Sequence, residues 1–310
     1  MVRSGLWLAP ALVAAIVAVQ DQALRDPPIF RTAIDLIGVT VTVLDRDGRL
    51  VKNMPREAFE VFEDGESQTV TQFSSDRVPV SLGILLDTSD SMFGRRIEDA
   101  RTAVEGFVSD LLDPADEFAI VAFNHQPHVI VGWTGDRGEL RRAFRQLRPW
   151  GGTAVYDAIM GSLPLLEARH RQRAALVLIS DGADTASDTA LRDVRLALLR
   201  SDAFVYAVAI DSPDRHAINT AVNPQALREI TDQSGGRTET VHGSGELLAV
   251  LSGIADELNN QYLLGYTSRR GVDGQYHSIR VRVRGADYRV HARNGYVAPR
   301  GRQSQRKTDR

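Results

Sequence analysis

The sequence of 310 residues contains no cysteine. This absence excludes disulfide bonds, thiol nucleophiles, zinc-thiolate sites and iron–sulfur clusters. The sequence also has no large excess of charge of one sign: it contains 37 basic and 40 acidic residues, and the formal net charge is -3. The basic residues are almost all arginines scattered along the chain, so no global field favours nucleic acid. Nucleic-acid binding is therefore not expected.

Long apolar runs are also missing, apart from a short one near the start. Met1, Val2 and Arg3 precede an apolar run from Leu6 to Val19, and polar residues follow it. A membrane-spanning helix needs roughly 20 apolar residues, so this run is short for a permanent anchor. The pattern predicts a signal peptide over residues 1–20 and a secreted, periplasmic or cell-envelope protein. There are two alternatives, an uncleaved membrane anchor and a buried helix of the mature fold. Only the first of them would attach the protein to a membrane.

Residues 78–260 show strand and helix patterns in alternation. The strands are expected at 80–87, 117–123, 128–133, 174–181 and 203–210, and the helices at about 136–148, 153–168, 188–200, 224–233 and 244–260, with one more after residue 87. Such alternation requires crossover connections and a sheet covered on both faces. The predicted fold class is α/β, with a doubly wound, mainly parallel sheet.

Both flanks of this domain have the period-two pattern of strands. About four strands are expected in the N-terminal segment, residues 29–77, including two about the turn at Asp64, and about three in residues 261–298. Neither group covers a core alone, but seven antiparallel strands suffice for a small sandwich. We therefore expect the two flanks to pair into one β domain with the α/β domain inserted between them. The polar, basic tail at 299–310 is expected to be disordered.

Five oxygen-bearing side chains occur where predicted strands end and a helix begins. Asp87, Ser89 and Ser91 lie in the DTSDS segment after the first central strand, Asp181 ends a later strand, and Thr153 leads a helix. The carboxyl edge of an open α/β sheet is where ligands bind. Oxygen ligands without His or Cys suit a hard cation, Mg²⁺ above all, with Mn²⁺ or Ca²⁺ as alternatives.

Together, DTSDS, the threonine of GGTAVYDA and the aspartate of LISDG resemble the metal ion-dependent adhesion site (MIDAS) of von Willebrand factor type A (VWA) domains, which have a Rossmann-like fold. The resemblance covers about residues 78–260. It implies that Ser89, Ser91 and Thr153 bind the ion directly, and that Asp87 and Asp181 bind it directly or through water. It also implies adhesion or scaffolding through an Asp or Glu of a partner, a protein or an extracellular matrix-like ligand. The flanks, with YLLGYTS and RNGYVAP, resemble bacterial VWA-related proteins of an acidobacterial type.

Two further carboxylates lie near this set and have alternative readings. Asp184 could orient a bound water or cap the loop before the following helix, and Asp157 could fix the Thr153 loop or act structurally at its helix start. His125 and His128 suggest a transition-metal pair only weakly, because no third ligand is near in sequence.

Enzymatic activity is not expected. The sequence lacks the GxxxxGK(S/T), GxGxxG and GxSxG signatures, and Ser89 stands where a haloacid dehalogenase-like phosphatase would need a second aspartate. The rival functions are an exported structural domain with a loop-stabilising ion, a cytoplasmic partner subunit of an ATPase and, least favoured, a metal-dependent hydrolase.

Overall fold

The structure, a computed structural model, describes residues 36–180, 184–210, 224–270, 273–285 and 287–299. Within these ranges, no helix is long and apolar enough to cross a membrane. The predicted signal peptide, residues 1–20, lies outside the described residues, and so does the predicted tail apart from Pro299.

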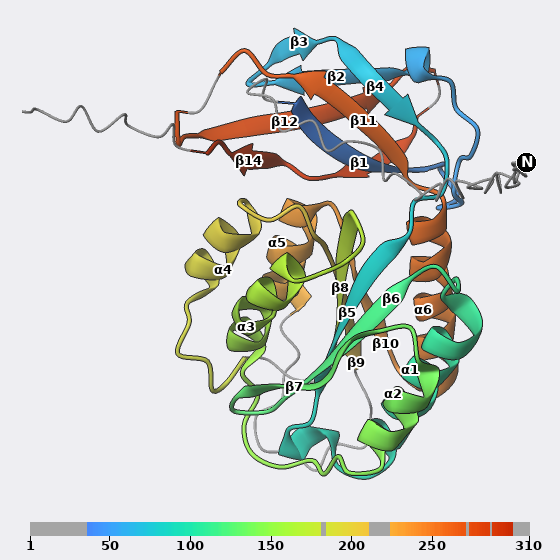
Figure 1. Ribbon diagram of the computed structural model, residues 1–310, viewed down its shortest axis with the longest axis vertical. Coiled ribbons are helices and arrows are strands. Elements are labelled where there is room, and N and C mark those ends of the chain that lie inside the picture. The colour runs from blue at the N-terminus through green and yellow to red at the C-terminus, as the bar shows by residue number, and fades with distance from the viewer. Residues whose placement is uncertain (1–35, 181–183, 211–223, 271–272, 286, 300–310) are drawn as a thin grey trace, which may run out of the picture. The chain divides into compact units, whose positions relative to one another are not determined.

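A six-stranded sheet forms the centre of the α/β region (Figure 1). Its order is β10 (Thr238–Val241), β9 (Phe204–Ile210), β8 (Arg173–Ser180), β5 (Val80–Asp87), β6 (Glu117–Phe123) and β7 (Pro127–Thr134). All neighbours are parallel except β6 and β7. Every residue of β5 is buried, because helices cover both faces, and this explains its nearly continuous apolar sequence. The predicted fold class is confirmed.

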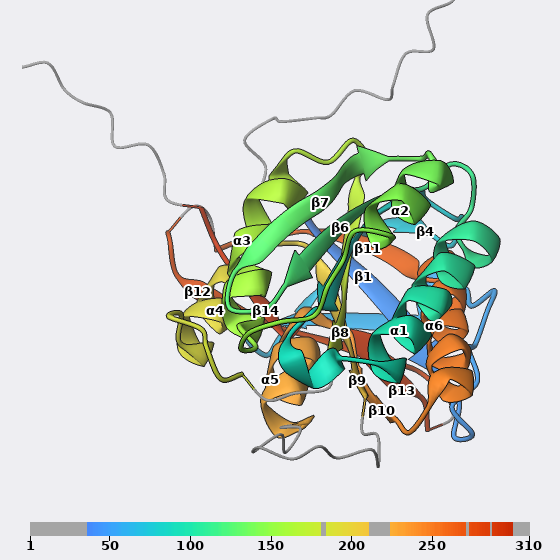
Figure 2. The ribbon, with the colours of Figure 1, turned by 90° about the horizontal axis from the view of Figure 1, so that it is seen from below.

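Three helices pack on each face of this sheet (Figure 2). One face is covered by α1 (Arg95–Gly106), which continues as the π-helix η3 (Phe107–Leu111), α2 (Arg137–Phe144) and α6 (Ser244–Asn259). The other is covered by α3 (Val155–Glu167), α4 (Leu191–Leu198) and α5 (Pro224–Ser234). Successive residues of β5 alternate between the two cores: Ile84 and Leu86 contact the first, and Leu85 the second.

The flanking segments form two four-stranded antiparallel sheets around a third core, here called the β-sandwich. One sheet has the order β13 (Arg289–Ala292), β1 (Leu36–Leu44), β11 (Tyr262–Thr267) and β4 (Val70–Ser74). The other has the order β14 (Gly295–Val297), β12 (Tyr276–Val283), β2 (Phe59–Glu63) and β3 (Glu66–Gln68). The short 3-10 helix η1 (Arg56–Ala58) leads into β2. The N- and C-terminal flanks pair directly, β1 with β11 and β2 with β12.

The elements differ from expectation in two places. The C-terminal flank, expected to hold about three strands, has four among the described residues, because its last part divides into β13 and β14 in different sheets. Asn294 between them donates its N–H to the Gln233 carbonyl and accepts a bond from Ile279 N. The edge strand β10 was not expected, because TETV is short and mostly polar.

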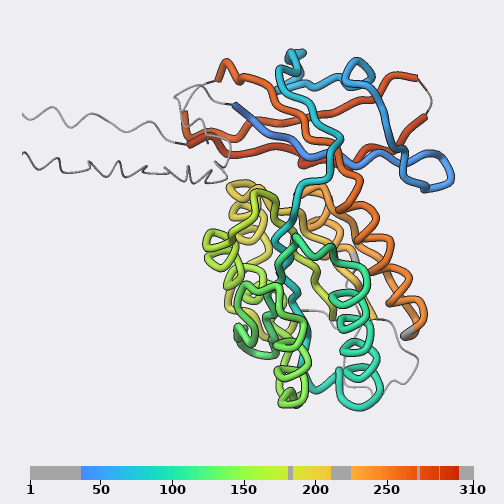
Figure 3. Tube along the Cα trace, turned by 45° about the vertical axis from the view of Figure 1, so that its right-hand side comes forward, coloured from blue at the N-terminus to red at the C-terminus, as the bar shows by residue number. Residues whose placement is uncertain are grey.

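Two chain segments connect the β-sandwich to the α/β region and lie side by side (Figure 3). Arg77, on the first, donates to Asn259 Oδ1 at 2.8 Å and to Asp116 Oδ2 at 2.6 Å. Gln261, on the second, is buried and donates to Thr42 of β1 and Tyr206 of β9. The two regions therefore share buried polar contacts.

Candidate metal centre

Asp87 is the last residue of β5, which lies between β6 and β8. The chain continues from β5 to β6 on one side and later adds β8 on the other, so the strand order reverses here. The Asp87 carboxylate is buried and both oxygens accept hydrogen bonds, Oδ1 from Ser89 N at 2.8 Å and Oδ2 from Ser180 Oγ at 2.5 Å. The carboxylate is therefore held in one orientation at the switch point of the sheet, the usual place for a ligand.

Ser89 and Ser91 present their hydroxyls to each other. The chain turns sharply after Ser89 into the 3-10 helix η2 (Asp90–Met92), and the two Oγ atoms lie 2.9 Å apart. Ser89 is buried and Ser91 half-buried. The turn thus gathers two neutral oxygen donors within one short segment beside Asp87.

The Thr153 segment is attached to the same turn by backbone hydrogen bonds. Trp150 N donates to the Thr88 carbonyl at 2.9 Å, and Asp90 N donates to the Gly151 carbonyl at 3.0 Å. Gly151 has φ of 80°, and a Cβ there would lie 3.2 Å from His125 Nδ1, so this close approach favours glycine. The structure therefore brings the DTSDS segment and the Thr153 loop together.

Asp181 lies outside the described residues, but the residues on both sides of it are attached to the other two motif segments. Ser180, before it, donates to Asp87. Thr185, after it, donates its N–H to the Thr153 carbonyl at 2.8 Å and accepts from Thr153 N through its hydroxyl at 3.1 Å. All three segments of the motif thus meet at this edge of the sheet.

Asp184 and Asp157 have hydrogen bonds that fix loops. Asp184 Oδ1 accepts from Tyr156 N in the first turn of α3 at 3.3 Å and from Ser187 Oγ at 2.5 Å, so it caps α3 and not the following helix, α4. Asp157 accepts from the backbone N–H groups of Asp188 and Thr189, each at 3.0 Å. Burial raises the pKa of Asp157, but a hydrogen bond from the Thr189 side chain and these backbone hydrogen bonds outweigh it and hold the pKa below the ordinary value.

Sequence reasoning missed Ser180, Thr185 and Asn124, whose carbonyl accepts from Ala154 N at 2.6 Å. Only Ser180 carried a signal, its position beside Asp181 at a strand end. The His125 ring lies edge-on to Trp150, with centroids 4.5 Å apart, and His128 is exposed on β7. Among the described residues, no three His, Asp or Glu side chains lie close enough together to hold a metal ion. Asp181 lies outside the described residues, and serine and threonine hydroxyls are ligands of a different kind.

Large apolar side chains are exposed on the segments that carry the site. Phe93, directly after η2, is 76% exposed, and Trp150, before Gly151, is 55% exposed. Aromatic side chains are enriched at the centres of protein–protein interfaces. We call this pair the aromatic rim.

Comparison with known proteins indicates the family of the α/β region. Residues 82–183 match the family described as von Willebrand factor type A domain. The chain carries a von Willebrand factor type A domain, and its solved structural neighbours share the fold. A von Willebrand factor type A protein from Catenulispora acidiphila covers 87% of this chain and 75% of its own at TM-score 0.51 and 13% identity. Proximal thread matrix protein 1 from the mussel byssus covers 64% of this chain and 51% of its own at TM-score 0.51 and 15% identity.

The curated relatives match this chain over only part of their own length. An uncharacterized Synechocystis protein is 26% identical over 129 residues, 41% of this chain and 30% of its own. Inter-alpha-trypsin inhibitor heavy chain H4 of Bos taurus is 26% identical over 128 residues, 37% of this chain and 14% of its own. The chain thus spans less than a third of the length of these relatives.

Proposed function

We propose that this protein binds a partner protein through a divalent cation, Mg²⁺ with Mn²⁺ or Ca²⁺ as alternatives. Ser89, Ser91 and Thr153 would hold the ion, with Asp87 and Asp181 beside it. The observation that carries the proposal is the attachment of all three motif segments to one another at the switch point of the sheet. The VWA family supports the coarser part, a protein-interaction module.

The donors of the described segments fit a hard cation. They are oxygen atoms, and the serine pair at 2.9 Å is neutral. Both Asp87 oxygens are already hydrogen-bonded, which favours a role for this carboxylate through water. With few carboxylates bound to it directly, the cation would keep much of its positive charge. An Asp or Glu of a partner could then complete its coordination.

The aromatic rim supports a protein as the partner. Phe93 and Trp150 offer apolar surface on two segments of the candidate site. Aromatic residues carry much of the binding energy at protein interfaces. The expected target is therefore an acidic side chain with apolar residues next to it.

Two rival functions make different predictions. An ion that only stabilises loops leaves partner binding independent of the metal and of the aromatic rim. A hydrolase in which Asp87 attacks phosphorus is not favoured, because both of its oxygens are buried and hydrogen-bonded. We therefore propose binding without turnover, outside the cytoplasm; a mature N-terminus after residue 20, measured by mass spectrometry, would support export.

Calorimetric titration with Mg²⁺ and Mn²⁺ tests the site. We expect one ion per chain for the wild type and no measurable binding for the double variant Ser89→Ala, Ser91→Ala, because both neutral ligands are removed. The control, Ser67→Ala with Ser252→Ala, removes two hydroxyls on β3 and α6 and should bind as the wild type does. Equal titrations for all three proteins would exclude the site.

Partner capture tests the function of the bound ion. Capture from cell-envelope or culture material should be lost with EDTA, return with added Mg²⁺, and be absent for the Ser89, Ser91 variant. Capture that survives EDTA while calorimetry shows an ion would favour the loop-stabilising role.

A further inference from the structure

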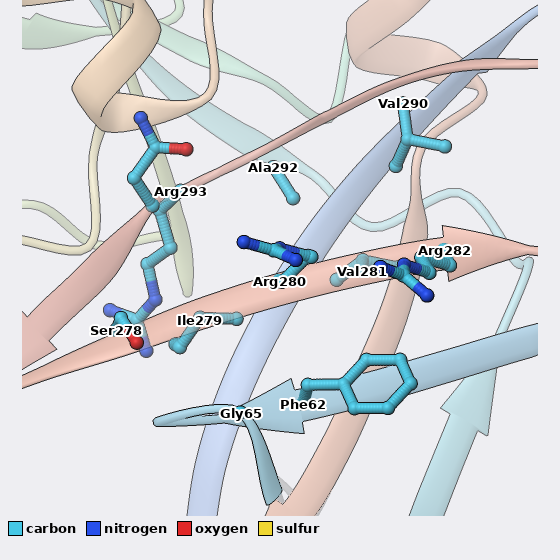
Figure 4. Close-up of a pocket in the computed structure, with 11 residues that line it drawn as sticks. Phe62, Gly65, Ser278, Ile279, Arg280, Val281, Arg282, Val290, Ala292 and Arg293 are labelled. Atoms are coloured by element: carbon cyan, nitrogen blue, oxygen red, sulfur yellow. The ribbon is translucent and has the colours of Figure 1, made fainter. Parts of the chain in front are cut away.

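A groove of about 550 Å³ opens on the β-sandwich (Figure 4). None of the residues that line it belongs to the candidate metal centre. β12 forms one wall and the β13 segment, with Val290 and Ala292, forms the other. Phe62 of β2 and Arg293 lie at its borders. The groove thus runs between an edge of one sheet and the edge strand of the other.

One side of β12 lacks a strand partner along half its length. Asp64 N donates to the Ser278 carbonyl and Arg284 N to the Ala58 carbonyl, so even-numbered residues direct their backbone groups towards β2. Backbone groups alternate along a strand, so those of Val281 and Val283 point to the other side. There, β14 pairs only with Tyr276–Ser278, and within the described ranges nothing pairs with Val281 or Val283.

The open edge is positively charged. Arg280 and Arg282 are exposed on β12, and neither has a carboxylate within ion-pair distance in the described part of the chain. Glu60, opposite Arg282, is bound to Arg284 at 2.7 Å. The Arg282 guanidinium lies over the Phe62 ring, 5.3 Å from its centroid, so it is held beside the groove.

Arg293 adds a third positive group at the groove. Its Nη2 donates to the Gly38 carbonyl at 2.7 Å, and its buried Nε has no partner among the described residues. In Figure 4 its side chain extends towards the Ser278 end of β12. The groove therefore combines unpaired backbone groups with an excess of positive charge.

We propose that this edge of β12 binds an extended acidic segment of a partner protein by strand addition. The segment pairs with the backbone of Val281 and Val283, places its acidic side chains beside Arg280 and Arg282, and turns small apolar side chains towards Val290 and Ala292. Like charges on facing edges repel, so the same arginines disfavour pairing with a second copy of this chain. The chain's own end, RGRQSQRKTDR, is basic and is disfavoured for the same reason.

Amide hydrogen exchange of the full chain, followed by NMR, tests the open edge. The amides of Val281 and Val283 should exchange much faster than those of Arg280 and Arg282, which face β2. An eight-residue peptide of alternating valine and glutamate should slow both valine amides. Slow exchange in the protein alone means that another segment already covers this edge and overturns the proposal, as does exchange that the peptide leaves unchanged.

Binding of the same peptide, labelled for fluorescence anisotropy, separates strand pairing from simple charge attraction. Arg280→Glu with Arg282→Glu should weaken binding roughly tenfold or more, because two charge-assisted contacts become repulsive. The control, Arg141→Glu with Arg145→Glu at α2, makes the same charge change at two exposed residues and should bind as the wild type does. A peptide N-methylated at alternate amides should not bind. Equal binding of the methylated peptide, or equal weakening by both variants, contradicts strand addition.

Discussion

Each region of the molecule has a fully buried carboxylate on the last residue of a strand, Asp87 on β5 and Glu63 on β2, and the two are used differently. In the α/β region, Asp87 lies beneath loops that carry further oxygen donors, and the hydrogen bonds it accepts include those from the backbone N–H of Ser89 and the hydroxyl of Ser180. In the β-sandwich, Glu63 is held by three hydroxyls: Tyr266 at 3.1 Å, Tyr296 at 2.8 Å and Ser268 at 2.9 Å. Both carboxylates are fully buried.

The difference lies in what surrounds each group. All hydroxyl partners of Glu63 are themselves buried, so its hydrogen bonds close on one another inside the core. Burial, with the Glu63 charge, raises the pKa of Tyr266 and Tyr296, the latter to about 12, so both phenols remain donors. Asp87 instead lies under segments with exposed aromatic residues. A closed network stabilises a core, whereas a network at a loop edge is suited to binding.

The largest expected effect comes from opening the closed network. Glu63→Ala leaves three buried hydroxyls without their acceptor and creates a cavity, so we expect the free energy of unfolding to fall by about 3–5 kcal/mol. Denaturant unfolding measures it. Glu66→Ala, on the next strand, removes an exposed carboxylate paired with Arg270 and should cost under about 1 kcal/mol. Similar losses for the two variants would mean that the Glu63 network contributes little.

Much of this architecture could be predicted from sequence, but the Glu63 network could not. Continuous apolar runs located β5, β6, β8 and β9, because strands buried on both faces need them. Along β2, the period-two pattern places Phe59, Val61 and Glu63 on the inner face, so the signal was present. A glutamate at an inward position is normally taken to mark the end of a strand. The partners of Glu63, which are Tyr266, Ser268 and Tyr296, lie some 200 residues away in the sequence, so no local pattern indicates them.

The candidate site was predictable to a similar depth. The strand ends and the helix start located Asp87, Ser89, Ser91 and Thr153, whereas the hydrogen bonds between loops depend on tertiary contacts that a linear pattern does not contain. Trp150 N bonding to the Thr88 carbonyl is such a contact. Exposure of Phe93 and Trp150 was equally hidden, because an aromatic residue in a loop gives no periodic signal.

A second effect should separate binding from stability in the α/β region. Phe93→Ala with Trp150→Ala should weaken metal-dependent partner binding by roughly tenfold or more, because aromatic anchors carry interface energy. Unfolding should change little, since both side chains are largely exposed. Leu196→Ala on α4, where the side chain is 49% exposed, is the matched control and should alter neither property. An unchanged affinity would remove the aromatic rim from the proposed interface.

A smaller effect concerns the pH dependence of the β-sandwich. Burial lowers the pKa of His277, but hydrogen bonds to Asp64 at 2.9 Å and Asp273 at 3.2 Å outweigh it, so the net pKa is raised. A raised folded pKa gives stability that is fully present below the unfolded value, about 6.5, and lost as pH rises through the folded pKa. The stability advantage of the wild type over His277→Gln should therefore shrink as pH rises above about 6.5 and through the folded pKa. An advantage that is constant with pH would show that His277 acts only by packing.

The smallest effect should have the opposite sign and belongs to the α/β region. Asp157 has a lowered pKa because, against the opposing effect of burial, the side chain of Thr189 and the N–H groups of Asp188 and Thr189 bind its ionised form. Its contribution is present above the unfolded pKa, about 3.9, and is lost as pH falls through the folded value. The advantage of the wild type over Asp157→Asn should thus shrink below about pH 4, whereas that over His277→Gln should shrink as pH rises above neutrality. Parallel pH profiles for the two variants would contradict this, because the ionisation of Asp157 and that of His277 would then affect stability in the same direction.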